Sequence, residues 1–248
     1  MESFLTLLLY PLTRLWDGLQ AVRGRWPTER RLRALADSPR ARAARAAELE
    51  RIRRLVEALG AVEGVEHVLT HVLDHRTRPR PLDVLDRLSD AEAVLICRLH
   101  ARAYYVIRED ITAVLPRIEA AGLAAWRRAD QRPSAGGTVE HALRWYRDGG
   151  TTEEGRAMDS PGLSSAVARL HWDLPGVLRP APLPVSAPAH PRFLMDQTPA
   201  QPAAADLLRE ARADGRGLVL ELVLGTDGKD RRQYHVVPRG GFLGRGRF

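Results

Sequence analysis

The sequence is poor in cysteine and in lysine. Its 248 residues contain one cysteine, Cys97, and one lysine, Lys229, among 38 basic residues. A single cysteine excludes an intramolecular disulfide and any cysteine-based zinc finger, and it suits a reducing compartment. We therefore expect a cytoplasmic protein whose positive charge is carried by arginine, which stays charged and grips phosphate or carboxylate through a planar fork.

Aromatic residues and long apolar runs are also scarce. Aromatic side chains make up 6% of the chain, and no stretch approaches the ~20 apolar residues that a membrane-spanning helix needs. The opening stretch MESFLTLLLYPL lacks the basic start and the small-residue cleavage site of a signal peptide. These absences predict a soluble protein with no transmembrane segment.

Acidic residues are fewer than basic residues in this sequence. The formal net charge is +7 and the sequence pI is about 10.4. Residues 1–60 hold 12 basic and 7 acidic side chains, and residues 176–248 hold 11 and 7, so the excess lies at both ends. This distribution predicts an anionic partner: nucleic acid first, with a membrane surface or an acidic protein as alternatives.

The first 26 residues carry apolar side chains at steps of three and four. This spacing is typical of a seam along one helix face, formed by Leu5, Leu8, Leu12, Leu15, Leu19, Val22 and Trp26. Burial on the chain's own domain is the plainest explanation. The functional hypotheses are contact with a protein partner, self-association, and a peripheral position on a membrane surface.

Helical patterns dominate the next hundred residues. Ser38-Pro39 is a favourable helix start and Gly60 a natural helix stop. Residues 61–75 continue the helical apolar pattern, and the stretch after Asp90 is long enough for another helix. Within that stretch Arg98, His100 and Arg102 alternate with apolar residues as they would in a strand. A further helix is expected through Pro116 as far as Gly122.

Shorter elements are expected after residue 130. The patterns predict short helices in TVEHALRWYRDGG, SPGLSSAVARLHW and AADLLREARADG. A proline-rich stretch separates the last two of these. GLVLELVL and RRQYHVVPR flank GTDGKD, which predicts a β-hairpin because Asp-Gly accepts the backbone of a tight turn.

These elements together predict a mainly α fold with a small β component. We expect a helical N-terminal domain at residues 1–130 and short helices and loops at residues 131–174. A Pro-rich linker or strap would follow at residues 175–202, and a helix, a β-hairpin and an Arg/Gly/Phe tail at residues 203–248.

Three histidines, His67, His71 and His75, stand at steps of four. On a helix His67 and His71 could share a metal ion such as zinc. The apolar residues of this segment cluster on the other side of the same helix, so a solvated polar face is the simpler interpretation. We expect no cofactor, with zinc as the one alternative.

Two stretches bear on nucleic acid. The segment VLPRIEAAGLAAWRRADQRPSAGGTVEHALRW resembles the recognition helix and wing of winged helix-turn-helix DNA-binding domains, and the resemblance implies DNA contacts by Arg127 and Arg128. The C-terminal RGGFLGRGRF is similar to a short arginine-glycine-rich tail of RNA-binding proteins. Its candidate contacts are Arg239, Phe242, Arg245, Arg247 and Phe248.

The sequence is therefore interpreted as a non-catalytic binding or assembly protein. Its arginine-rich ends would engage nucleic acid, helped by Arg40, Arg42 and Arg45 of the helix that starts at Pro39. The N-terminal seam would engage a protein partner. Two alternatives stay open: a structural oligomer with no nucleic-acid role, and a metal-dependent enzyme using histidines of the helical region.

Overall fold

The computed structural model describes residues 27–78, 93–124, 126, 138–165, 168–180, 204–213, 217–224 and 233–238, and the backbone of residues 193–197. The described residues form an α+β fold in which five helices pack on one antiparallel sheet of seven strands. The predicted mainly α fold is wrong, because segments read as helices, and part of the Pro-rich stretch, are strands.

The helices lie at both ends of the chain and in its middle. They are α2 (Glu29–Ala36), α3 (Pro39–Gly60), α5 (Ile111–Ala120), α6 (Val139–Arg147) and α7 (Ala204–Ala213). The strands are β1 (Val65–Thr77), β2 (Ala93–Ile107), β3 (Leu163–Ser164), β4 (Ala168–Trp172), β5 (Phe193–Gln197), β6 (Leu218–Leu224) and β7 (Gln233–Pro238).

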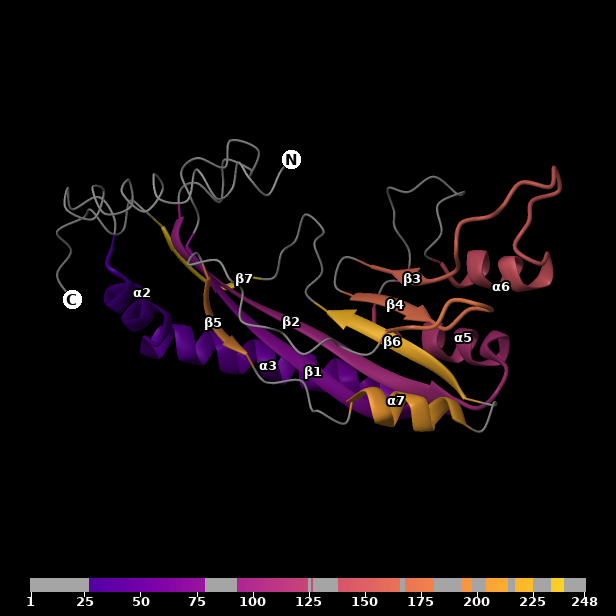
Figure 1. Cartoon of the computed structure of the whole chain (residues 1–248), viewed down its shortest axis with the longest axis horizontal. Coiled ribbons are helices and arrows are strands. Elements are labelled where there is room, and N and C mark those ends of the chain that lie inside the picture. Colours follow the sequence, from indigo (N-terminus) through magenta and orange to yellow (C-terminus); the bar gives the residue numbers. More distant parts are fainter. Residues whose placement is uncertain are drawn as a thin grey trace.

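The long strands β1 and β2 form the centre of the sheet (Figure 1). The strand order is β3-β4-β6-β2-β1-β5, and β7 pairs with β2. β6 pairs with residues 101–107 of β2 and β7 with residues 93–98, so these two strands lie end to end along one edge of β2. The prediction of a hairpin is therefore wrong. Both of its expected arms, β6 and β7, are strands, but each of them pairs with β2 instead of with the other.

Residues 61–75 were expected to be helical, but they form a turn followed by β1. Val65, Leu69 and Val72 suit a helix face by spacing, yet a β-branched and apolar segment also suits a strand. The turn requires Gly64, which has φ +85 and whose added Cβ would lie 2.7 Å from the Glu109 Oε1 atom. This turn reverses the chain, so β1 runs back along α3.

Four helix predictions are confirmed. α3 begins at Pro39, with the Ser38 hydroxyl accepting from the Ala41 amide, and ends at Gly60 as expected. α5 contains Pro116, and α6 and α7 also lie in segments predicted to be helical. SPGLSSAVARLHW forms β3 and β4 rather than a helix.

The sheet separates two apolar layers (Figure 1). On one side α3, α5 and α6 cover the odd-numbered residues of β2, such as Ala101, Ala103 and Tyr105. On the other side α7 covers Tyr104 and Val106. The Tyr105 hydroxyl donates to the Val56 carbonyl oxygen of α3 over 3.0 Å, a buried link between helix and sheet.

The resemblance to a winged helix-turn-helix domain does not extend to the fold. The segment before α5 is the 15-residue strand β2, where that domain would have helices. The apolar face of α5 is buried in the main core through Ile111, Val114, Leu115 and Ile118.

Candidate functional site

The face of the sheet opposite α3 carries arginine and histidine side chains on neighbouring strands. Side chains alternate between faces along a strand, so residues 98, 100 and 102 of β2 point away from the α3 side. The register places His75 opposite Arg98 and His71 opposite Arg102. We call this surface the arginine–histidine face; its residues are His71, His75, Arg98, His100, Arg102, Arg169 and His171.

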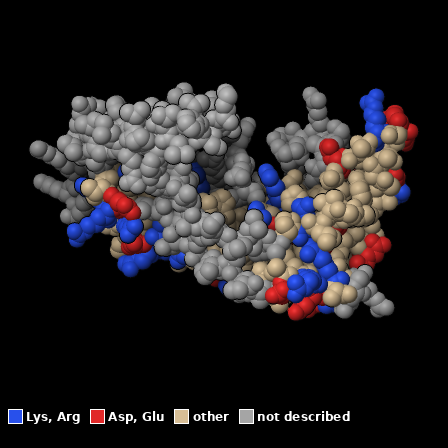
Figure 2. Space-filling model, viewed as in Figure 1, with Lys and Arg blue, Asp and Glu red and all other residues tan. Residues whose placement is uncertain are grey.

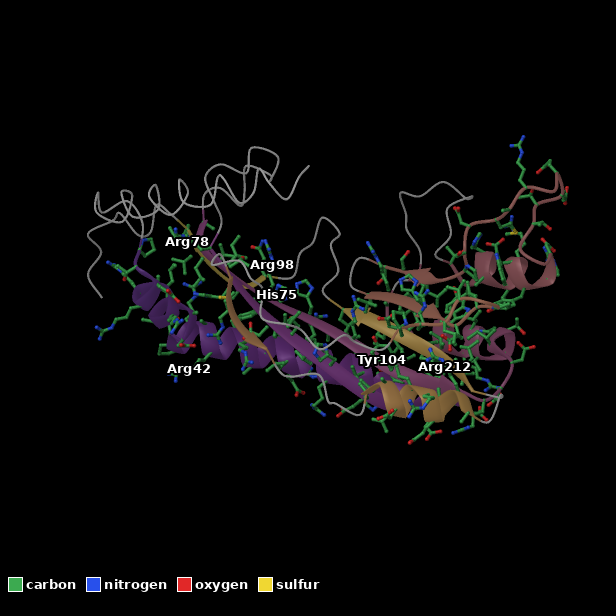
Figure 3. All side chains as sticks on the ribbon, viewed as in Figure 1. Arg42, His75, Arg78, Arg98, Tyr104 and Arg212 are labelled. Carbon is green, nitrogen blue, oxygen red and sulfur yellow. The ribbon has the colours of Figure 1, made fainter. Side chains whose placement is uncertain are left out.

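The side chains of this face are buried to different degrees. Arg102 and Arg169 are exposed, whereas the histidines are half-buried. The rings of His75 and His100 meet edge to face, with centroids 4.9 Å apart. Figure 3 shows Arg98 and His75 close together at the end of the sheet where β5 and β7 lie, and Figure 2 shows blue arginine atoms between the tan surface and the undescribed part.

Two carboxylates lie on this face among the described positions of β1, β2, β4 and β6: Glu221 of β6, and Glu66 of β1, which is 3.6 Å from the Arg108 guanidinium group. The buried Glu221 Oε1 atom accepts from the Tyr104 hydroxyl over 3.2 Å and from Arg102 Nη1 over 3.4 Å. Burial raises the pKa of Tyr104, so its phenol stays a hydrogen-bond donor at neutral pH. Glu221 thus offsets one positive charge of the face and positions Arg102.

Positive charge is concentrated around His171. Burial lowers the pKa of this histidine, and the nearby guanidinium groups of Arg179 and Arg169 lower it further. The Arg179 backbone is fixed, since its amide donates to the buried Asp173 carboxylate and its carbonyl accepts from Arg212. Asp173 also binds two nitrogens of Arg212, each over 2.8 Å, and therefore neutralises that arginine.

A second polar cluster lies on the α3 side, centred on the buried carboxylate of Asp74. The buried Asp74 carboxylate accepts from Arg45 Nε over 2.8 Å, from Arg76 Nη2 over 3.3 Å and from the Tyr234 hydroxyl over 2.9 Å. Burial raises the pKa of Cys97 beside it to about 11. The Cys97 thiol is therefore protonated and a poor nucleophile at neutral pH. This cluster joins α3 to β1 and β7.

The arginines predicted on α3 have different environments. Arg40 and Arg42 are exposed, and Figure 3 shows Arg42 on α3, away from the strands. Arg45 instead binds the buried Asp74. The remaining predicted contacts lie outside the described residues: the seam from Leu5 to Trp26, Arg127, Arg128, and the tail residues Arg239, Phe242, Arg245, Arg247 and Phe248.

His67 and His71 do not come together. A register shift between His67 and Leu69 places His67 opposite Tyr105, on the α3 side, and His71 opposite Arg102, on the other side. The helix that the predicted metal pair required is a strand, and the two imidazoles lie on opposite faces of the sheet. The described residues contain no group of three or more metal-ligating side chains.

Sequence analysis missed the arginine–histidine face as a site. The alternation of Arg98, His100 and Arg102 was the available signal, because it places three basic side chains on one side of a strand. No pattern in one segment could assign His71, His75 and Arg169 to the same surface. They reach it through pairing between strands distant in sequence.

The fold and the site define an antiparallel α+β protein with one basic sheet face. Comparisons with protein-family models, with curated proteins and with solved structures found no match. Among the helices described, none has the length and apolar character required to cross a membrane.

Proposed function

We propose that this protein binds nucleic acid through the arginine–histidine face. The observation that carries the proposal is the register of β1, β2, β4 and β6, which places three arginines and four histidines on one face together with the carboxylates of Glu221 and Glu66. Guanidinium groups bind phosphates, and both guanidinium and imidazole groups stack on bases. The net charge of +7 supports the same class of partner.

The predicted contacts at the two ends of the chain extend this proposal. Arg40 and Arg42 are exposed on α3 and could follow a phosphate backbone beyond the sheet. The arginine-glycine tail at residues 239–248 and the N-terminal seam remain predictions, for nucleic acid and for a protein partner respectively.

The first test measures binding of the full chain to labelled single- and double-stranded RNA and DNA by fluorescence anisotropy. The salt concentration is varied from about 50 to about 200 mM, because release of counterions makes affinity for phosphates fall steeply over this range. We expect a steep salt dependence and a preference for one form of nucleic acid. Absence of binding at the lowest salt concentration contradicts the proposal.

A pair of matched variants locates the contact. Arg102→Gln with Arg169→Gln removes two exposed charges from the face, whereas Arg53→Gln with Arg54→Gln removes two charges that Glu50 and Glu57 already hold on α3. We expect the first pair to lower the salt slope by between about 1 and 2, because Glu221 already offsets part of the Arg102 charge, and the second pair to change it little. Equal effects of the two pairs would mean that only net charge matters.

The tail is tested separately by replacing Arg239, Arg245 and Arg247 with Gln. Weaker binding with the same preference among nucleic acids would place the tail beside the sheet face as a second contact. Unchanged binding would remove the tail from the proposal and leave the sheet face in it.

A further inference from the structure

α3 and β1 enclose an apolar groove on the side of the sheet that faces α3. The cavity has a volume of about 700 Å³, within the range of binding pockets. We call it the α3–β1 groove; Leu49, Ile52 and Val56 form its helix wall, and His67, Thr70 and Val72 form its strand wall. Figure 1 shows α3 running along β1.

The two walls of the groove have the same length. From Leu49 to Gly60 the helix rises ~16 Å at 1.5 Å per residue. From His67 to Val72 the strand also extends ~16 Å at about 3.3 Å per residue. A straight groove of this length holds about five residues of an extended chain, whose alternate side chains would point into it.

The groove lies at an edge of the sheet. β5 pairs with residues 73–77 of β1, and no strand among the described residues pairs with the outer edge of residues 65–72. Alternate backbone amides and carbonyls of an edge strand point outward, where another strand can bond them, and none of the strands in the described part of the chain bonds this stretch of β1. The groove is therefore bordered by hydrogen-bonding groups along one side.

The charges around the groove are already matched to one another. Arg53, on the helix side, binds both Glu50 and Glu57 through its guanidinium group. On the strand side the His67 Nε2 atom and the Thr70 hydroxyl lie 2.8 Å apart and form a hydrogen bond. A ligand that complements these walls is uncharged and apolar where it enters the groove, because burying an unpaired charge there would be unfavourable.

We propose that the α3–β1 groove binds an extended peptide segment of a partner protein. The segment adds to β1 as a new strand, and its alternate apolar side chains enter the groove. Addition of a strand to a sheet edge gives affinity through main-chain hydrogen bonds and specificity through the pockets beside the edge. The bound stretch is about five residues long and carries no charge.

The test begins with a displayed library of random heptapeptides, selected against the full-length chain. We expect enrichment of uncharged peptides with apolar residues at alternate positions. A synthetic, end-blocked and labelled copy of an enriched peptide is then titrated with the protein by fluorescence anisotropy. Failure to enrich alternating apolar sequences overturns the proposal.

A groove-filling variant tests the location. Gly60 lines the groove, and a Cβ added there would lie 3.6 Å from His67 Cβ and 3.8 Å from Tyr105 Cε1, which are ordinary contacts. Gly60→Leu should weaken peptide binding by about tenfold or more, and circular dichroism compares the folded state of the variant with that of the unmodified chain. Ala46→Leu, at an exposed position of α3 outside the groove, is the matched control and should bind as the unmodified chain does. Equal binding by both variants contradicts the location.

Methylation of the peptide backbone tests the mode of binding. An added strand offers alternate amides to β1, so N-methylation at every second residue should abolish binding while methylation at the intervening residues is tolerated. Uniform tolerance contradicts strand addition. Sedimentation equilibrium provides a further check: a dimer of the unmodified chain that Gly60→Leu dissociates would make a second copy the occupant and overturn the peptide proposal.

Discussion

At the scale of single residues, Asp74 holds together side chains from three elements. Its buried carboxylate binds Arg45 of α3, Arg76 of its own strand and Tyr234 of β7. Arg76 also binds Asp37, just after α2, over 2.9 Å. The network therefore connects α2 and α3 to the sheet.

Asp74→Asn should destabilise the protein strongly. The amide keeps the shape of the side chain but removes the negative charge that compensates the largely buried Arg76, and loss of one partner of a buried ion pair costs about 3–5 kcal/mol. Urea unfolding measures the change. Glu119→Gln, an exposed carboxylate on α5, is the control and should stay within about 0.5 kcal/mol. A similar small change for Asp74→Asn would mean that the network contributes little to stability.

The sequence shows the chemistry of each residue, but it does not show which residues lie next to it in the fold. The sequence offers the single cysteine no disulfide partner in its own chain, and Cys97 is a buried free thiol. Arg45 was expected to bind phosphate, but it binds Asp74, 29 positions along the chain. A side chain's charge is visible in the sequence, whereas the partner that neutralises it depends on the fold.

At the scale of elements, both ends of α3 could be predicted from the sequence. Ser38 and Pro39 mark its start and Gly60 its end, because caps and stops act within one turn of the helix. β1 was misread because residues 62, 65, 69 and 72 have apolar side chains at helical spacing. Pairing with β2 on one side and burial under α3 outweighed that spacing.

Ser38→Ala should lower stability by about 1 kcal/mol. The Ser38 hydroxyl accepts from the Ala41 amide over 3.3 Å, and alanine would leave that amide without its cap. Thermal unfolding measures the change. Ser38→Asn, which can also accept this hydrogen bond, should stay within a few tenths of a kcal/mol of the unmodified protein. Equal losses for both variants would show that the hydroxyl contributes through packing rather than through capping.

At the scale of the whole molecule, partly buried histidines link stability to pH. Burial lowers the pKa of His67, His171 and His235, and nearby arginines lower the last two further. The unfolded chain, with histidine pKa values near 6.5, binds protons first as the pH falls. The stability gained from keeping these rings neutral is therefore present above about pH 6.5 and is lost on further acidification.

We expect the urea midpoint to fall between about pH 7.5 and about pH 5.5, where most carboxylates stay ionised. The triple variant with His67→Gln, His171→Gln and His235→Gln should show a smaller fall, because glutamine does not titrate. Arg54→Gln, an exposed charge on α3, should keep the fall of the unmodified chain. A full decrease in the triple variant would assign the pH dependence to other groups.

The sequence by itself determined the properties that act over short distances: the net charge, the lone cysteine, the caps of α3, the kink-prone Pro116 within α5 and the strands on either side of GTDGKD. Only the tertiary structure decided that β6 and β7 lie end to end on β2, and that His71, Arg102 and Arg169 share a face. The physical reason is that helix caps and charges depend on neighbouring residues. Strand partners and sheet faces are instead set by non-local hydrogen bonds and burial, which one segment does not encode.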